Sequence, residues 1–362
     1  MKHLFMSLLL CFSMQAIAQE TLTEEEIRYR DSIININESS LATAVSQKNY
    51  NEGIAAFNAK NYPLAISKYK AAIEADQNFI AAYFNLALAE NEAEKPKDAI
   101  QTLSVLLKID PTYTKAYFQR AIANQKNNNF AAAENDYELA LKAEPNNPNV
   151  YYNYGTLMFL QKNYDAAIVK FSKTIQLEPK NAFAYNDRGS CKRMKGDYSA
   201  AVSDYEMAAK MNENLAFVLN NIGSTKTKMK DYEAALKAFN RAISIDNTFY
   251  LSYNNRGVCL MEMGKTVEAI KDFDKCVRTN PSYAPGYSNR AGAQFKMKEY
   301  SKALADANLA IQLDKEFADA YVNRGMAKEM LRNMNGACED WHKATELGSI
   351  LGKHYQSTNC SN

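Results

Sequence analysis

Residues 148–181 read PNVYYNYGTLMFLQKNYDAAIVKFSKTIQLEPKN, and this stretch contains two helix patterns separated by a short break. Asn163 lies in the break. Pro179 follows the second pattern, and proline ends a helix because it lacks a backbone N–H. Large side chains recur three or four residues apart, as in amphipathic helices: Tyr151, Tyr154, Met158, Phe171 and Ile175. The stretch therefore predicts a helical hairpin.

The same pattern returns every 34 residues along the chain. Small residues recur with it at positions 8, 20 and 27 of most units, here Gly155, Ala167 and Thr174, where they let backbones approach closely. One hairpin cannot bury its apolar faces alone, so we expect the units to stack into one cooperative array. Nine units align, and they begin near Ser46, Ile80, Thr114, Pro148, Ala182, Ala216, Tyr250, Ala284 and Ala318.

The repeated pattern resembles the tetratricopeptide repeat from Ser46 to about Leu347. It has an aromatic residue at position 4, a small residue at 8, Ala at 20, an aromatic at 24, Ala at 27 and Pro at 32. We number the units repeat 1 to repeat 9. The resemblance implies an all-α fold, a right-handed superhelical solenoid of tandem helix-turn-helix repeats. It also implies a concave inner face lined by the first helix of each repeat.

Arginine and aspartate are correlated at two positions of the repeat. Five repeats carry arginine at position 7, namely Arg120, Arg188, Arg256, Arg290 and Arg324. The same five carry aspartate at position 23, namely Asp136, Asp204, Asp272, Asp306 and Asp340. The other four have Lys68, Thr102, Lys170 and Ala238 at position 23. This predicts an ion pair between the two helices of one repeat, the alternative being a solvated surface pair. A pairing between neighbouring repeats is excluded, because Asp136 would then face Tyr154.

The resemblance implies that positions 2, 5, 6, 9, 12 and 13 line the concave groove. Position 6 is asparagine in most repeats, and a side-chain amide can both donate to and accept from a peptide bond. We expect a groove for protein or peptide partners, formed by Asn85, Asn153, Asn221, Asn255, Asn289 and Asn323 with Tyr50, Phe84, Phe118, Tyr152 and Phe159. The alternative is that asparagine is favoured at position 6 for packing between helices.

The first residues predict export. A basic start, a short apolar stretch and a small-residue site indicate a signal peptide over residues 1–18, cleaved after Ala18; a membrane anchor is the alternative. We therefore expect the mature protein in the periplasm or outside the cell. Residues 19–45 are expected to form a helical cap, beginning with the capping-box pair Thr23 and Glu26. Its apolar residues either cover repeat 1 or fold into the groove: Ile27, Ile33, Ile34 and Ile36.

Residues 348–362 predict a C-terminal cap or tail. Ile350, Leu351 and Tyr355 are expected to return over the last helix of repeat 9. Cys338 and Cys360 then come within reach of each other and predict a disulfide, with two free thiols as the alternative. The remaining cysteines lie at packing positions and are expected to be buried and unreactive: Cys191, Cys259 and Cys276.

The composition excludes several function classes. The formal net charge is +2, and no run of like charges indicates a nucleic-acid surface. His342 and His354 are the only histidines after the signal peptide, too few for a multi-histidine metal site. No catalytic or phosphate-binding motif occurs, so we expect neither an enzyme nor a cofactor. The sequence favours an exported scaffold for protein partners, and the alternative is a periplasmic chaperone-like adaptor for extended clients. It leaves the partner and the oligomeric state open.

Overall fold

The computed structural model describes residues 24–360, and these residues form a succession of antiparallel helices. The chain divides into two compact units, Met1–Ala143 and Glu144–Asn362. We call their described parts the N-terminal block, residues 24–143, and the C-terminal block, residues 144–360. The predicted signal peptide and the Thr23 end of the predicted capping box lie outside the described residues.

The N-terminal block contains repeats 1 to 3. Its helices are α2 (Glu24–Asn58), α3 (Tyr62–Ala75), α4 (Ile80–Glu92), α5 (Pro96–Ile109), α6 (Lys115–Lys126) and α7 (Phe130–Ala143). The C-terminal block contains repeats 4 to 9 and one further helix. Its helices are α8 (Pro148–Leu160), α9 (Tyr164–Leu177), α10 (Ala182–Met194), α11 (Tyr198–Met211), α12 (Ala216–Lys228), α13 (Tyr232–Ile245), α14 (Tyr250–Glu262), α15 (Thr266–Thr279), α16 (Ala284–Lys296), α17 (Tyr300–Leu313), α18 (Ala318–Met330), α19 (Met334–Glu346) and α20 (Ile350–Asn359). The first helices of repeats 2 to 9 begin within one residue of their expected starts.

The turn inside each repeat has one backbone conformation throughout. Lys162, in repeat 4, has a φ of 60°, and its N–H donates to the Phe159 carbonyl oxygen at 2.9 Å. The N–H of Asn163 donates to the Met158 carbonyl oxygen at 2.9 Å, which completes a Schellman C-cap. A residue with positive φ occupies the same place in all nine repeats: Lys60, Glu94, Asn128, Lys162, Gly196, Lys230, Gly264, Lys298 and Arg332.

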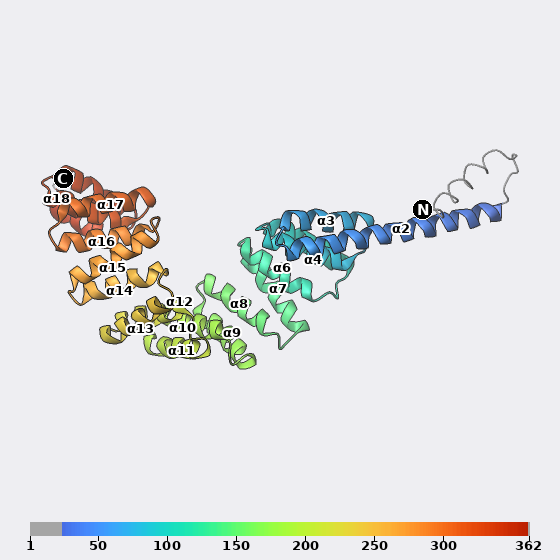
Figure 1. The fold of residues 1–362 in the computed structure, drawn as a ribbon, viewed down its shortest axis with the longest axis horizontal. Coiled ribbons are helices and arrows are strands. Elements are labelled where there is room, and N and C mark those ends of the chain that lie inside the picture. Colours follow the sequence, from blue (N-terminus) through green and yellow to red (C-terminus); the bar gives the residue numbers. More distant parts are fainter. Residues whose placement is uncertain (1–23, 361–362) are drawn as a thin grey trace. The chain divides into compact units, whose positions relative to one another are not determined.

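Each block is built by stacking successive hairpins (Figure 1). The two helices of a repeat pack against each other, and the second helix packs against the first helix of the next repeat. First helices of successive repeats also meet, as in α2 with α4 and α14 with α16. The second helices do not meet in this way among the described residues. The first helices therefore form the inner wall of each stack.

An aromatic ring at position 24 fills the centre of most repeats. In repeat 7 the Phe273 ring is 1% exposed and lies against Gly257. A Cβ at Gly257 would approach Phe273 Cε1 to 2.6 Å, so a larger residue does not fit there without displacing the ring. The small residues at positions 20 and 27, such as Ala269 and Cys276, are fully buried beside it. The 34-residue pattern thus corresponds to one close contact made again in most of the hairpins.

The segment before repeat 1 differs from both expectations for it. Residues 24–45 continue α2 as one helix that extends beyond α3, with no break at Ser46 (Figure 1). The side chains of Ile33, Ile34 and Ile36 are 40%, 45% and 63% exposed, so they cover neither repeat 1 nor the groove. The side chain of Ile27 is outside the described part.

The C-terminal segment folds back onto repeat 9 as α20. Cys338 and Cys360 form a disulfide, with a Cα–Cα distance of 5.7 Å across a separation of 22 residues. Tyr355 stacks on Trp341 with ring centroids 5.2 Å apart. Ile350 departs from its expected place, since it is 88% exposed. The remaining cysteines are buried, and burial raises the pKa of Cys191 to about 12 and that of Cys276 to about 11, as expected of unreactive thiols.

Removing the disulfide should release α20 from repeat 9. A Cys338→Ser, Cys360→Ser double variant is expected to lose about 3 kcal/mol of stability on the chain-entropy model. Urea unfolding with and without reductant measures this loss, and hydrogen exchange of residues 350–359 locates it. Reductant should leave the double variant unchanged. An equal response of both proteins to reductant would contradict the assignment.

Candidate functional site

The inner wall of the stacked first helices carries a chain of side-chain amides. In the C-terminal block, Asn221 Nδ2 donates to Asn186 Oδ1 at 2.9 Å. The same bond joins Asn255 to Asn220 at 3.0 Å and Asn289 to Asn254 at 2.9 Å. At the far end, Asn323 Nδ2 donates to the backbone oxygen and to Oγ of Ser288, both at 3.0 Å. In the N-terminal block, Asn85 Nδ2 donates to the Tyr50 hydroxyl at 2.9 Å. Position 6 is thereby bonded to position 5 of the preceding repeat.

These bonds give the asparagines a structural role that the sequence offered as the alternative. A side-chain amide that bridges two repeats fixes their stacking, and the bond is partly shielded from water. Asn153 is the exception among the predicted groove asparagines, because its Nδ2 donates to the Asn149 carbonyl oxygen within α8 at 2.8 Å. That a partner's backbone also contacts these amides stays a prediction.

One link of the amide chain is replaced by a tyrosine and a carboxyl group. Tyr152 donates from its hydroxyl to Asp187 Oδ2 at 2.6 Å, and Asn186 Nδ2 donates to Asp187 Oδ1 at 2.9 Å. Burial raises the pKa of the Asp187 carboxyl above its ordinary value, and the hydrogen bonds from Tyr152 and Asn186 oppose that shift. Ionised Asp187 is therefore less stable in the folded protein than in the unfolded chain.

Asp187→Asn should stabilise the C-terminal block at neutral pH, because it restores the usual residue and removes a desolvated charge. Folding raises the pKa of Asp187, so the folded protein binds this proton more tightly than the unfolded chain does. Protonated Asp187 therefore contributes its whole stabilising effect below the unfolded pKa of about 3.9, and this effect is lost as the pH rises through the folded pKa. The variant's advantage should therefore grow as pH rises from about 4 to 7. Thermal unfolding of both proteins across this range tests the prediction, and parallel curves would contradict it.

The predicted aromatic groove residues are all partly buried and pack against other rings. Phe84 lies 5.2 Å from Tyr113, and Phe118 lies 6.3 Å from Tyr137, between ring centroids. Tyr50 packs against Phe79, Tyr152 against Phe171 and Phe159 against Tyr164, at centroid distances of 4.7, 5.7 and 5.6 Å. Tyr50, Phe84 and Phe118 lie in the N-terminal block, and Tyr152 and Phe159 lie in the C-terminal block. Each ring therefore contributes to packing within its block.

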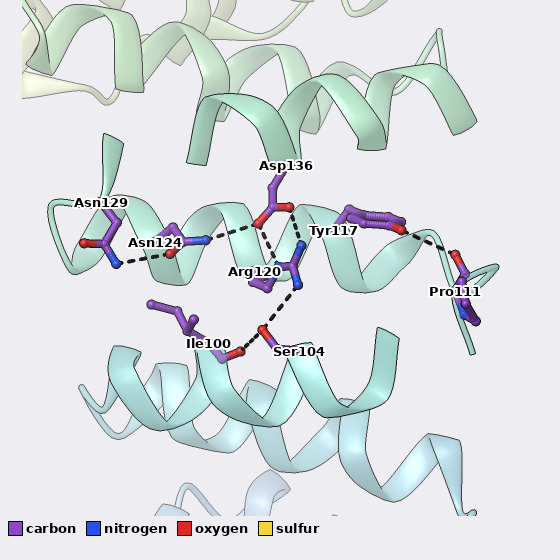
Figure 2. Close-up of polar contacts among 8 residues, drawn as sticks. All are labelled: Ile100, Ser104, Pro111, Tyr117, Arg120, Asn124, Asn129 and Asp136. Carbon is purple, nitrogen blue, oxygen red and sulfur yellow. Dashed lines mark hydrogen bonds and ion pairs between the residues drawn. The ribbon is translucent and has the colours of Figure 1, made fainter. Parts of the chain in front are cut away.

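The five arginines of position 7 each form a bidentate ion pair inside their own repeat. Arg120 Nε and Nη2 donate to the two oxygens of Asp136 at 2.8 and 2.7 Å (Figure 2). The aspartate side chains are 3–9% exposed and the arginines 17–22%, so these are not solvated surface pairs. The pairs are Arg120–Asp136, Arg188–Asp204, Arg256–Asp272, Arg290–Asp306 and Arg324–Asp340. They lock the two helices of a repeat together.

The third arginine nitrogen corrects the expectation that neighbouring repeats are not bridged. Arg120 Nη1 donates to Ser104 Oγ on α5, in the preceding repeat, at 3.2 Å (Figure 2). The partners of the other four are Ser172, Asn240, Asp274 and Asn308. A second correlation in the sequence indicates this contact between neighbouring repeats. Position 25 is Ser, Asn or Asp before an arginine repeat, whereas Lys70, Glu138 and Glu206 precede the others.

The tyrosine of the recurring Tyr-x-x-Arg motif lies beneath its own arginine. The Arg256 guanidinium carbon is 5.7 Å from the Tyr253 ring centroid, and the other four pairs lie at 5.3–5.7 Å. Repeat 4 keeps the contact in another form, with Lys170 Nζ 4.0 Å from the Tyr154 ring. Repeat 1 reverses the charges, with Glu52 at position 7 and Lys68 at position 23, 2.6 Å apart. Positions 7 and 23 are thus paired even where the sequence correlation did not detect them.

Two hollows open on the inner wall of the C-terminal block. One, of about 260 Å³, is lined by Ser224 and Thr227 of α12 and by Asn255 and Val258 of α14. The other, of about 540 Å³, lies among α14, α16, α18 and α20 and contains Asn289 and Asn323. We call the larger one the C-terminal pocket. Three of the predicted groove asparagines, Asn255, Asn289 and Asn323, therefore lie at the edges of open space.

Two kinds of feature are absent from the described residues. Residues 24–360 contain no group of three or more His, Cys, Asp or Glu side chains placed to hold a metal ion. No helix in this part of the chain is long and apolar enough to span a membrane. Buried and partly buried carboxyl groups occur in the five arginine–aspartate pairs, at Asp187 and at Glu90 of α4, which is 1% exposed and accepts a hydrogen bond from Thr102.

Comparisons with known proteins agree with this architecture. A structure of a tetratricopeptide repeat protein from Parabacteroides merdae ATCC 43184 superposes with a TM-score of 0.58 at 19% identity, covering 68% of this chain and 99% of that one. The structure titled APC/C hetero-tetramer Cut9–Hcn1 gives 0.56 at 16% identity, covering 87% and 76%. PilF of Pseudomonas aeruginosa gives 0.51 at 21% identity, covering 58% and 96%. At these identities the likeness concerns the fold alone. No curated protein matches the sequence.

Family models agree with the repeat boundaries. Two models, each described as tetratricopeptide repeat, match residues 50–114 and 118–182 and residues 216–249 and 250–283. Together they cover more than half of the chain. The chain belongs to the tetratricopeptide repeat family and is a repeat scaffold of the kind that mediates protein interactions.

Proposed function

We propose that this protein is an exported, non-enzymatic scaffold that binds a protein or peptide partner along the inner wall of its first helices. The observation that carries the proposal is the pair of hollows beside Asn255, Asn289 and Asn323. The larger hollow combines apolar side chains, among them Phe273, Phe295 and Val322, with a few polar groups, the usual composition of a ligand site.

Two observations support export. The sequence of residues 1–18 has the order of a cleavable signal, with a basic start, an apolar stretch and a small-residue site. The Cys338–Cys360 disulfide also fits an oxidising compartment, because such bonds are rare where glutathione and thioredoxin keep thiols reduced. Mass spectrometry of the protein purified from its native cell tests this proposal. A chain that starts at Gln19 supports it, whereas a chain that retains residues 1–18 contradicts a cleaved signal and favours a membrane anchor.

A matched pair of substitutions tests partner binding on the inner wall. Ser224→Arg places a long side chain in the smaller hollow, on α12. Ser203→Arg makes the same change on the exposed surface of α11, a second helix. Capture from an envelope extract, quantified by mass spectrometry, should lose its main partner with Ser224→Arg and keep it with Ser203→Arg.

The same experiment separates a scaffold from a chaperone-like adaptor. A stoichiometric partner supports the scaffold, whereas a broad set of weakly held clients supports the adaptor. Equal capture by the two folded variants would contradict binding on the inner wall. Circular dichroism melting of both proteins establishes that they are folded.

A further inference from the structure

Gly292 is the one helical glycine in residues 24–360 that close packing does not require. Glycines at position 8, such as Gly257 and Gly325, lie against large rings, and a Cβ there would come within 2.6 and 2.4 Å of ring atoms. A Cβ at Gly292 would meet nothing closer than Asn323 Oδ1 at 3.8 Å. Gly292 also lies in the interior of α16, where glycine costs about 0.5–1 kcal/mol relative to alanine. The missing side chain therefore leaves open space at a cost to the helix.

The space beside Gly292 is the C-terminal pocket. Its apolar wall includes Phe273, Phe295, Val322 and Met326. Leu351 and Tyr355 of α20 close one side of it. The Tyr355 ring is fixed by stacking on Trp341, and α20 is fixed by the disulfide. At about 540 Å³ the pocket falls within the range of about 300–1,000 Å³ typical of ligand sites.

The polar groups at the pocket indicate which partner groups can lie next to an apolar side chain that enters it. The Nδ2 atoms of Asn289 and Asn323 donate to the preceding repeat, so their amide oxygens are the groups left to accept a backbone N–H. Glu262 and Asp319 contribute two carboxylates to the rim and Lys296 contributes one ammonium group. The rim therefore has an excess of negative charge and complements a basic neighbour of the apolar group.

We propose that the C-terminal pocket binds one large apolar side chain of a partner segment, flanked by a basic residue, and that Gly292 determines the size of side chain admitted. This inference rests on the proposed function, which it narrows to one anchor site. An aromatic or leucine-sized anchor fills the volume left by Gly292, and the two asparagine oxygens accept backbone N–H groups on either side of it. Anchors that fill such a pocket carry most of the energy of a peptide interface.

Methionine methyl NMR with two short peptides tests the inference, because Met261 and Met326 both line the pocket. Acetyl-Lys-Phe-Lys-amide should shift the methyl resonances of Met261 and Met326 saturably, whereas acetyl-Lys-Ala-Lys-amide should not. Gly292→Leu should weaken the phenylalanine peptide at least tenfold while leaving the melting temperature unchanged or higher, since leucine is the better helix former. Ser301→Leu, on the exposed surface of α17, is the matched control and should bind as the original protein does.

Several outcomes would overturn the inference. These are unshifted methionine methyls at millimolar phenylalanine peptide, equal shifts with the alanine peptide, or unchanged binding by Gly292→Leu. Occupation by the exposed helix of residues 24–45 would also overturn it, and Ile34→Asp would reveal this by moving both methyl resonances without peptide. Partner capture that is lost in Ser224→Arg but kept in Gly292→Leu leaves the proposed function standing and removes the anchor site. If the peptide binds in the pocket but Ser224→Arg leaves partner capture unchanged, the anchor site stands and the proposed function is removed.

Discussion

Asp272→Ala is expected to destabilise the C-terminal block by about 3–5 kcal/mol, the usual cost of removing one partner of a buried ion pair. The Asp272 side chain is 9% exposed and accepts two hydrogen bonds from Arg256, at 2.7 and 2.6 Å. Hydrogen bonding to Asp272 raises the pKa of Arg256, against the opposing effect of burial. Without Asp272 that support is lost, but the guanidinium stays charged because the intrinsic pKa of arginine is far above neutral. The loss is thus the cost of an uncompensated charge.

A double-mutant cycle separates that cost from the worth of the pair. Arg256→Met combined with Asp272→Leu should cost much less than Asp272→Ala alone, because no buried charge is then left unpaired. Asn240, which loses its bond from Arg256 Nη1, is exposed and can be hydrated. Urea unfolding gives the free energies, and hydrogen exchange in α14 and α15 locates the loss. Additive effects of the two single changes would contradict a buried pair.

Repeat 1 supplies the matched control for this cycle. Lys68 and Glu52 occupy the same two positions with the charges reversed, and their side chains are 33% and 40% exposed. Glu52→Ala should therefore cost far less than Asp272→Ala, because a solvated pair contributes little to stability. Equal losses from Glu52→Ala and Asp272→Ala would show that burial does not set the cost.

Trp341→Ala should destabilise repeat 9 by about 3–5 kcal/mol, the range for removing a buried aromatic side chain. Trp341 is fully buried, lies against Gly325 and supports Tyr355 of α20 by stacking. The cavity should loosen α20 and open one side of the C-terminal pocket. Urea unfolding measures the loss, and faster hydrogen exchange over residues 350–359 should accompany it.

Trp341→Phe is the control, and it should cost much less. The Trp341 Nε1 atom has no hydrogen-bond partner among residues 24–360, so phenylalanine gives up no bond seen there and keeps a ring against Tyr355. A loss in Trp341→Phe as large as in Trp341→Ala would mean that the indole, and not ring packing, holds this end of the chain.

The repeat period predicted most of the fold because most hairpins bury the same contact. The contacts of Gly257 with Phe273 and of Gly325 with Trp341 are local, so their spacing in the sequence determines them. The arginine–aspartate pairing could be found for a similar reason, since both residues change together within one repeat. The contact of the Tyr253 ring with Arg256 is also local, because the two residues lie one helical turn apart on α14.

Features that depend on two repeats or on a chain end were harder to predict. The bond from Arg120 to Ser104 required comparing position 7 with position 25 of the preceding repeat. Whether Ile33 and Ile36 are buried or exposed depends on whether the residues before Ser46 turn back onto repeat 1, and no local pattern specifies such a turn. The C-terminal pocket combines Gly292 with Leu351 of α20, and only the packing of α20 brings them to the same cavity.

Photo-crosslinking in the native cell is the most direct measurement of whether partners bind the inner wall. A photoreactive residue would replace Ser190, Ser224 or Val258 on first helices, and Ser203 or Val267 on second helices. The account predicts that one partner crosslinks from the first-helix positions and not from the second-helix positions. Crosslinks that form only from Ser203 and Val267, or equally from both sets, would contradict it.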